Sequence, residues 1–169
     1  FTVTAKSPLT GILGDSAAGG QFAAEMKLTG FDQIIIAGKA DELLYLLITE
    51  SGVEFVECPE LAGKIITETT AAIRSAHHDY GIQAAVIGQA GENEVLYSTI
   101  VSSGHRVNGR TGMGAVMGSK NLKAVAVRGA KTVEIADTLR FLEEVKKIES
   151  DIMSHNEYQK RYDMGTTML

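Results

Sequence analysis

The chain has 169 residues, of which 44% are hydrophobic, and a formal net charge of −5 at pH 7. This size is sufficient for the core of one domain, and an acidic chain with few aromatic residues argues against nucleic-acid binding as its main task. No apolar run is long enough to cross a membrane. The single cysteine, Cys58, excludes an internal disulfide and an iron–sulfur cluster ligated by about four thiolates of this chain.

The first forty residues predict a strand, a loop, a helix and a second strand. Phe1 to Ala5 alternates apolar and small polar residues, which is typical of a strand. The small-residue stretch from Leu9 to Gly20 is interpreted as a loop that leads into a helix over 21–28, and 31–38 is interpreted as a buried strand ended by glycine. The loop either contacts a ligand through backbone N–H groups or is a tight turn before the helix, and taken alone it favours the turn.

The middle of the chain predicts further strands and one helix. Alternating residues predict a hairpin of two strands, over 43–49 and 53–57. A capping threonine predicts a helix from Thr67 that ends at Gly81. Apolar runs predict later strands over 83–88, 95–101 and 122–127. His77 and His78 lie near the end of the predicted helix. Adjacent helical residues point about 100° apart, so the two imidazoles are poorly placed to share a metal. Cys58 is interpreted as a strand-end residue without chemistry.

One stretch, residues 104–125, dominates the functional interpretation. Five of its first fifteen residues are glycines, at positions Gly104, Gly109, Gly112, Gly114 and Gly118. From Val95 to Val133 there is no Asp or Glu, whereas six basic residues lie inside, namely Arg106, Arg110, Lys120, Lys123, Arg128 and Lys131. A glycine-rich, positively charged segment in an acidic chain predicts an anion-binding loop for phosphate or pyrophosphate.

Two common phosphate-binding motifs do not fit this stretch. A Rossmann loop needs a long helix after its glycines, but the next predicted strand begins within about four residues of Gly118. The P-loop pattern of Gly, four residues, Gly-Lys-Ser/Thr does not occur.

From Asp137 the pattern changes to helical spacing, with apolar residues at Leu139, Leu142, Val145, Ile148 and Ile152. We expect this helix to begin another layer or domain. The chain starts at Phe1 without a visible targeting signal and stops after this helical pattern, which we interpret as a piece of a longer polypeptide.

Four motifs together resemble a known family. They are Lys6-Ser-Pro-Leu-Thr-Gly11, Ala18-Gly-Gly20, Gly88-x-Ala-Gly-Glu-Asn93 and, above all, Gly104-His-Arg-x-x-Gly-Arg-x-Gly-Met-Gly-Ala-Val-Met-Gly-Ser-Lys-Asn-Leu-Lys-Ala124. In this order they closely resemble the N-terminal domain of the aldehyde:ferredoxin oxidoreductase family of tungsten or molybdenum enzymes. The resemblance implies an α+β fold, in which a β-rich domain of two similar halves with a few helices is followed by the start of a helical domain. It divides the chain into a cofactor-binding domain over 1–133, truncated at its N-terminus, and the start of a helical domain over 134–169.

The resemblance also implies a ligand and its contacts. In the family a bis-pterin cofactor carries tungsten or molybdenum, and a magnesium ion bridges the two pterin phosphates. By position, the pterin-binding residues are Gly19, Arg106, Val107, Gly109 and Arg110, and the backbone carbonyls of Ala17 and Val107 are the magnesium ligands. Ala17 stands where some relatives have Asn, and Val107 where some have Ala. Because the contact is a backbone oxygen, neither difference removes it.

Some roles remain open from the residues alone. Arg106 is expected to neutralise phosphate or to hydrogen-bond the pterin in a forked geometry. Arg110 either does the same or belongs to a solvated face, and Lys120 and Lys123 favour solvated or ion-paired roles. His105 is either a pterin donor or a structural hydrogen-bonding group.

For the intact protein the resemblance implies oxidation of aldehydes to carboxylic acids, with electrons passing through a 4Fe-4S cluster to ferredoxin in an anaerobic cytoplasm. No catalytic residue is expected within these 169 residues, and the 4Fe-4S cluster is expected from residues outside them. The expected partners are ferredoxin and a small aldehyde, with neither nucleic acid nor membrane, and a homodimer is left open. The alternatives are a reductase subunit acting on acyl-CoA thioesters of the benzoyl-CoA type, and a non-redox module that binds anions or nucleotides.

Overall fold

The computed structural model of the protein describes residues 1–168, and the chain separates into two compact units, Phe1–Thr132 and Val133–Leu169. The first unit contains eight strands and five helices, in the order β1 (Thr2–Lys6), β2 (Leu13–Ala17), α1 (Gln21–Leu28), β3 (Leu44–Thr49), β4 (Gly52–Glu57), η1 (Pro59–Leu61), α2 (Ile66–Ala76), β5 (Gln83–Val86), α3 (Gln89–Glu92), β6 (Ile100–Ser102), β7 (Arg106–Asn108), α4 (Met113–Ser119) and β8 (Leu122–Val127).

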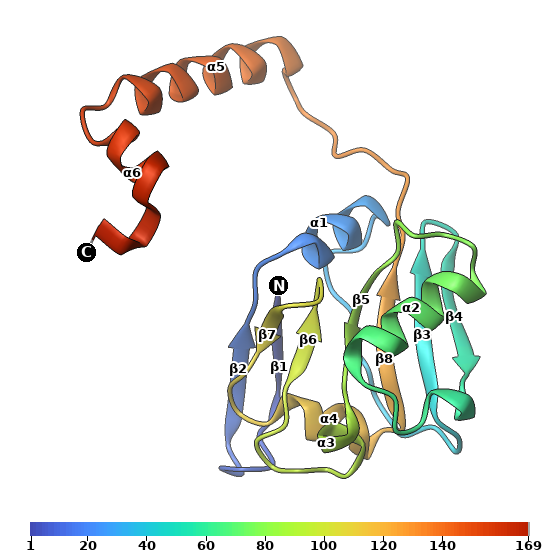
Figure 1. Ribbon diagram of the computed structural model, residues 1–169. Coiled ribbons are helices and arrows are strands. Elements are labelled where there is room, and N and C mark those ends of the chain that lie inside the picture. Colours follow the sequence, from blue (N-terminus) through green and yellow to red (C-terminus); the bar gives the residue numbers. More distant parts are fainter. Residues whose placement is uncertain (169) are drawn as a thin grey trace. The chain divides into compact units, whose positions relative to one another are not determined.

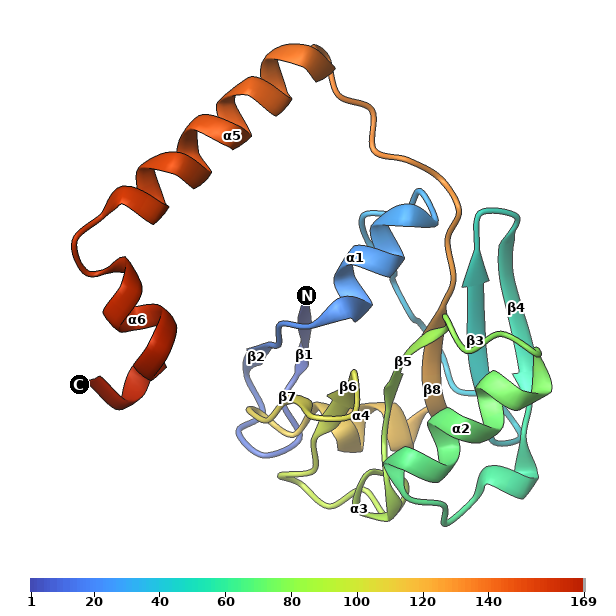
Figure 2. The ribbon, with the colours of Figure 1, turned by 45° about the horizontal axis from the view of Figure 1, so that its top comes forward.

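Six of these strands form one mixed sheet in the order β4-β3-β8-β5-β6-β7, and β1 and β2 form a separate antiparallel hairpin. Within the six-stranded sheet β3 and β8 are parallel, and the other neighbouring strands are antiparallel. Both views place the β1–β2 hairpin beside β6 and β7 (Figures 1 and 2). The edge strand of the sheet therefore lies next to the hairpin.

The sheet separates two hydrophobic clusters because successive residues of a strand point to opposite faces. On one face α2 packs through Ile73 onto Tyr45 and Leu47 of β3, with Val86 of β5 beside them. On the other face α1, α4 and β1 pack onto the alternate residues of the same strands. The members of this second cluster include Phe22, Leu46, Ile48, Ala85, Ile100, Met113, Met117, Leu122, Val125 and Val127.

Lys123 occupies an irregularity between β3 and β8. Leu44 pairs with Leu122 and Tyr45 pairs with Ala124, so Lys123 is the extra residue of a β-bulge. A bulge redirects a side chain out of the normal alternation. The Lys123 side chain is fully buried, and its ammonium bonds the carboxylate of Glu92 and, at 2.8 Å, the carbonyl of Lys64.

The order of elements occurs twice. A hairpin, a helix and a strand follow one another as β1–β2–α1–β3 and again as β6–β7–α4–β8, and the two final strands are parallel neighbours. The predicted α+β fold is confirmed. The helix predicted over 21–28, the hairpin of β3 and β4, and the strand over 122–127 are confirmed as well.

Two predictions near the N-terminus are wrong. Residues 31–38 form no strand, and Ile35 is 81% exposed. Both sides of β3 are already occupied by β4 and β8, so this isoleucine-rich segment has no edge to pair with there. Conversely, the stretch interpreted as a loop contains β2. Its inward positions are Gly14 and Ser16 rather than large apolar residues, because a Cβ at Gly14 would lie 2.7 Å from the Cβ of Thr111.

Two later boundaries also differ. Helix α2 begins at Ile66 and ends at Ala76, and the carboxylate of Glu68, not Thr67, bonds the free N–H of Ile65 at 3.2 Å. It ends before Gly81 because His78 adopts a left-handed conformation with φ 50°. The strand predicted over 95–101 shortens to β6, since the Ser98 carbonyl accepts a bond from Gly114 of α4 at 3.1 Å.

His77 and Cys58 belong to the face covered by α2. The Nε2 atom of His77 lies 2.7 Å from the hydroxyl of Tyr45, and burial raises the pKa of Tyr45. Cys58 is fully buried, and burial raises the pKa of its thiol to about 12. Both residues therefore have structural surroundings, as the sequence favoured.

The second unit is helical. It contains α5 (Thr138–Ser154), α6 (Tyr158–Met164) and the 3-10 turn η2 (Gly165–Met168). Asp137 caps α5 by accepting a bond from the N–H of Arg140 at 3.0 Å, so the predicted helix start is confirmed. None of the helices in residues 1–168 is both long and apolar enough to cross a membrane.

Candidate functional site

The structure brings together the two loops that the sequence singled out. Asn108 of β7 donates through Nδ2 to the carbonyl of Ser16 at 2.7 Å, and the N–H of Arg110 donates to Ser16 Oγ at 3.1 Å. At the start of α1 the N–H of Gln21 donates to Ser103 Oγ at 3.1 Å. Residues 17–20 and 103–110 thus form one surface, which we call the two-loop cradle.

The contact between the loops is close enough to require a glycine. Gly20 has φ 95°, and a Cβ there would lie 2.8 Å from Cγ of Arg106 and 3.0 Å from Ser103 Oγ. The stem of Arg106 therefore crosses directly over the backbone of the first loop. This juxtaposition fixes the base of an arginine whose charged end is exposed.

The glycines of the central segment divide into two groups. A Cβ at Gly112 would lie 2.0 Å from the carbonyl oxygen of Leu96, and a Cβ at Gly114 would lie 2.6 Å from that of Thr99. A Cβ at Gly118 would lie 1.8 Å from the carbonyl oxygen of Gly91. These three glycines allow α4 to pack against α3 and the backbone before β6. The central segment is therefore not a single ligand-binding loop, and its second half is a buried helix.

Gly104 and Gly109 of this segment, and Gly19 of the first loop, are not packed against another element. Among residues 1–168, no atom outside the immediate chain neighbours lies within 4 Å of a Cβ built at Gly19 or Gly104, and the nearest to Gly109 is Val107 Cγ1 at 3.4 Å. All three belong to the two-loop cradle. Only this half of the glycine pattern leaves bare backbone available to a ligand.

Each of the predicted site residues is exposed on this surface. These residues are Ala17, Gly19, Arg106, Val107, Gly109 and Arg110. His105 is exposed beside them. The structure therefore brings the predicted contacts together, and their roles toward a ligand stay predictions.

The carbonyl of Ala17 is directed away from its partner strand. Phe1 and Ala18 exchange two backbone bonds, of 2.8 and 2.9 Å. Bonded and non-bonded pairs alternate in an antiparallel ladder, so the next pair, Thr2 and Ala17, is non-bonded. Val107 lies on the edge strand β7 and is 45% exposed. The Ala17 carbonyl is therefore free of strand pairing, and a backbone oxygen of this kind suits a hard cation.

The remaining lysines of the segment do not belong to the cradle. Lys123 is buried against Glu92, and Lys120 donates to the Gly38 carbonyl at 2.9 Å. Their structural roles follow the interpretation that the sequence favoured for them. Arg106 and Arg110 supply the exposed positive charge of the two-loop cradle, and two forked guanidinium groups with bare backbone between them suit phosphate oxygens.

Side chains alone do not build a metal centre here. In the part of the chain that the structure describes, no three His, Cys, Asp or Glu residues gather in a way that could hold a metal ion. A cation at the cradle would depend on backbone oxygens and on oxygens of its ligand.

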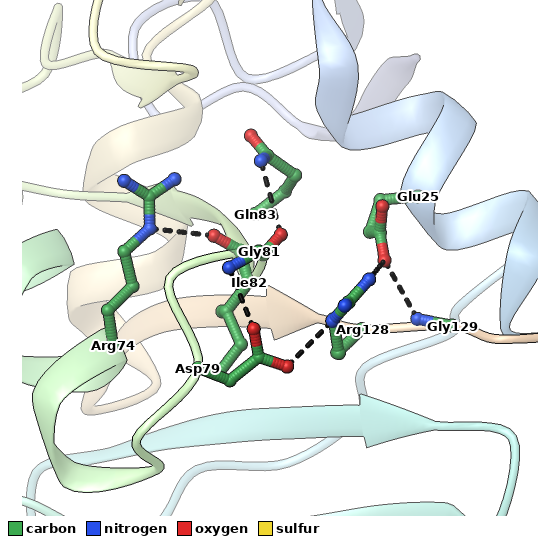
Figure 3. Close-up of polar contacts among 8 residues, drawn as sticks. All are labelled: Glu25, Arg74, Asp79, Gly81, Ile82, Gln83, Arg128 and Gly129. Atoms are coloured by element: carbon green, nitrogen blue, oxygen red, sulfur yellow. Dashed lines mark hydrogen bonds and ion pairs between the residues drawn. The ribbon is translucent and has the colours of Figure 1, made fainter.

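A second polar network anchors α1 through Glu25 (Figure 3). Arg128, just after β8, bonds Asp79 at 2.7 Å and Glu25 of α1 at 2.9 Å, and Glu25 also accepts from the N–H of Gly129 at 2.9 Å. Its hydrogen bond to Arg128 holds the pKa of Asp79 below the usual value, and the same bond raises the pKa of Arg128. The helix that follows the first loop is thus held at its first residue, Gln21, by Ser103 and near its middle, at Glu25, by Arg128 and Gly129.

Sequence reasoning missed the residues that join the loops. Ser16, Ser103 and Asn108 carry these bonds, yet Ser16 and Ser103 lie outside the quoted motifs and Asn108 is an unspecified position within one. The available signal was local: small polar residues lie within both predicted loops, as Ser16 and Asn108 do, or directly before one, as Ser103 does. Which of them pair depends on the position of the β1–β2 hairpin, which short-range patterns do not encode.

The structure thus defines an α+β domain whose repeated hairpin–helix units bring two glycine-containing loops together, with two exposed arginines on the second loop. Comparison with known proteins makes this class specific. Residues 1–129 match the family model described as aldehyde ferredoxin oxidoreductase, N-terminal domain. The chain belongs to the aldehyde ferredoxin oxidoreductase family, and its first unit is the family's N-terminal domain.

Individual relatives agree with this assignment. The chain is 48% identical over 147 residues to a tungsten-containing aldehyde ferredoxin oxidoreductase of Pyrococcus abyssi, covering 87% of this chain and 24% of the relative. It is 46% identical over 147 residues, with the same two coverages, to that of Pyrococcus horikoshii. The chain thus spans about a quarter of the length of the curated relatives it matches.

A solved structure is similar over nearly the whole chain. This structure is the active-site complex BamBC of benzoyl coenzyme A reductase in complex with 1,5-dienoyl-CoA. The TM-score is 0.86 at 38% identity, and the match covers 92% of this chain and 24% of that one.

Proposed function

We propose that the two-loop cradle binds the phosphate-bearing pterins of a tungsten or molybdenum bis-pterin cofactor, as part of an oxidoreductase that converts aldehydes to carboxylic acids. The observation that carries the proposal is the meeting of two loops, distant in sequence, at a basic surface with bare backbone. The names of the curated relatives support the reaction class and tungsten.

The residues present fit such a group. A Cβ at Gly19 or Gly104 would occupy space that no other part of residues 1–168 fills, so the cradle can accept a bulky ligand against its backbone. Arg106 and Arg110 would neutralise phosphate oxygens, each charge-assisted bond contributing about 1.5–3 kcal/mol. His105 lies on the same exposed loop and can donate to a ring nitrogen or oxygen of the pterin.

The backbone would hold the magnesium ion. The carbonyls of Ala17 and Val107 come one from each loop, so a cation bound by both would tie the halves of the cradle together. Hard divalent cations accept such oxygens together with phosphate and water. No side chain is required at either position, and for that reason Ala and Val are compatible with the role.

When bound, the cofactor supplies a metal centre that takes two electrons from the aldehyde substrate. In this chain the contribution of Arg106, Arg110 and the loop backbone is to bind and orient that group. We place a 4Fe-4S cluster and the residues that contact substrate in the rest of the polypeptide, and we propose ferredoxin as the electron acceptor in an anaerobic cytoplasm.

The experiment compares two arginine substitutions in the complete polypeptide that contains this chain. Arg106→Ala removes a cradle charge, whereas Arg140→Ala removes an exposed charge from α5. We expect bound pterin and tungsten or molybdenum, measured after anaerobic purification, to fall roughly 10- to 100-fold in the first variant, the loss of one charge-assisted bond. The control should retain both. Unchanged metal and pterin in Arg106→Ala would refute the assignment.

One observation favours a second candidate reaction. The similarity to the BamBC complex supports reduction of an aromatic acyl-CoA thioester by a protein with the same cradle. The higher identity to the aldehyde enzymes, 48% against 38%, makes aldehyde oxidation the first choice. Activity of the complete protein with a small aldehyde and ferredoxin, or instead with benzoyl-CoA, separates the two. Metal-free and pterin-free protein would leave the non-redox binding module.

A further inference from the structure

Asn108 connects the two halves of the cradle from below. Its side chain is fully buried, and its Nδ2 reaches the Ser16 carbonyl at 2.7 Å across 92 positions of sequence. Ser16 directly precedes Ala17, and Asn108 lies between Val107 and Gly109. The bond therefore joins the backbone immediately beneath the two carbonyls assigned to the cation.

A second side chain makes a similar connection from the other end of the loops. Ser103 Oγ accepts from the N–H of Gln21 at 3.1 Å, across 82 positions. The loops follow strands of two separate sheets, so ordinary strand pairing does not set their separation. The bonds made by Asn108 and Ser103 do, together with the bond from the Arg110 N–H to Ser16 Oγ.

The surroundings of Asn108 indicate that its donor matters. Its Oδ1 is buried and has no hydrogen-bond partner among residues 1–168. An unpaired buried acceptor is unfavourable. If position 108 served packing alone, leucine would be more stable there than asparagine. The amide is useful here because its N–H group crosses from β7 to β2.

We propose that Asn108 and Ser103 are positioning residues that hold the two loops at the separation the cofactor requires. This inference rests on the proposed function, and it adds residues that touch no ligand themselves. A ligand bound from two directions needs both halves prearranged, because a cradle that is loose by about 1 Å loses much of its affinity.

The test uses Asn108→Asp and Asn121→Asp in the complete polypeptide. Asn121 is a matched control, since its Nδ2 donates to the Ala40 carbonyl at 2.7 Å across 81 positions, at the turn between α4 and β8. Each substitution replaces the donor by a carboxylate facing a carbonyl. Ser103→Ala is a milder second variant at a half-buried position, in case Asn108→Asp does not fold.

Two readouts are measured. Hydrogen exchange of metal-free protein reports the loops, and we expect the Gln21 and Arg110 amides to exchange about tenfold faster in Asn108→Asp, with the Gln21 amide alone faster in Ser103→Ala. Bound pterin after anaerobic purification should fall severalfold in both, whereas Asn121→Asp should change neither readout.

Unchanged exchange at these amides in both cradle variants, or equal pterin loss in Asn121→Asp, would overturn the proposal. Wild-type protein without pterin would instead refute the proposed function. The exchange rates then still decide whether Asn108 and Ser103 couple the loops.

Discussion

Gly118→Ala tests whether the second half of the glycine motif serves packing. The new Cβ would lie 1.8 Å from the Gly91 carbonyl oxygen and 2.7 Å from its carbon. Both atoms are backbone, so α3 and α4 would have to separate by roughly 1 Å, at a cost near the upper end of the range of about 1–3 kcal/mol for overpacking. The better helix propensity of alanine returns about 1 kcal/mol, which leaves a net destabilisation of roughly 2 kcal/mol.

Native-state hydrogen exchange measures this loss locally. The amide of Gly114, bonded to the Ser98 carbonyl at 3.1 Å, should exchange about 30-fold faster in Gly118→Ala. Gly88→Ala is the control, because it lies at the start of α3 and its Cβ would meet only Ile66 Cδ1 at 3.7 Å. Equal exchange in Gly118→Ala and Gly88→Ala would refute the packing argument.

Three other predictions follow from the same structure. The Cβ of Gly19→Ala would meet open space at a backbone conformation that alanine tolerates. Thermal stability should therefore stay unchanged or rise by up to ~1 kcal/mol, while bound pterin falls. A loss of stability together with the loss of pterin would contradict this. Lys123→Met should destabilise the protein by about 3 kcal/mol or more in calorimetry, because it leaves the Glu92 carboxylate without its buried partner. Adding Glu92→Gln should recover part of this loss. Strictly additive losses in the double variant would argue against the ion pair. Burial raises the pKa of Cys58 from 9.0 to about 12, so the folded state favours the protonated thiol. The resulting stabilisation is present below pH 9 and is lost as the pH rises toward 12; Cys58→Ala should flatten that alkaline decline, and rapid alkylation of the native thiol at pH 8 would show that the pKa is not raised.

The sequence predicted those elements whose pattern is local. Strand β8, with six consecutive buried residues, and helix α5, with its apolar residues at helical spacing from Leu139, were both predicted from residues that are near one another in the chain. It failed where a distant partner decides. Residues 31–38 have a strand-like composition but no free edge beside β3, and β2 lacks large inward residues because Thr111 occupies that space.

The candidate site shows the same division in one motif. The residues expected on its surface could be assigned by resemblance, but glycine counts alone could not separate Gly118, which packs against Gly91, from Gly109, whose Cβ would meet only Val107 Cγ1 at 3.4 Å. A side chain would therefore have a different effect at each kind of position. At Gly118 it would reduce stability, whereas at Gly109 it would interfere only with a bound ligand. Stability and pterin binding should therefore be lost separately. Substitutions that reduce binding without loosening the α3–α4 contact would identify the ligand-facing half of the motif independently of any relative.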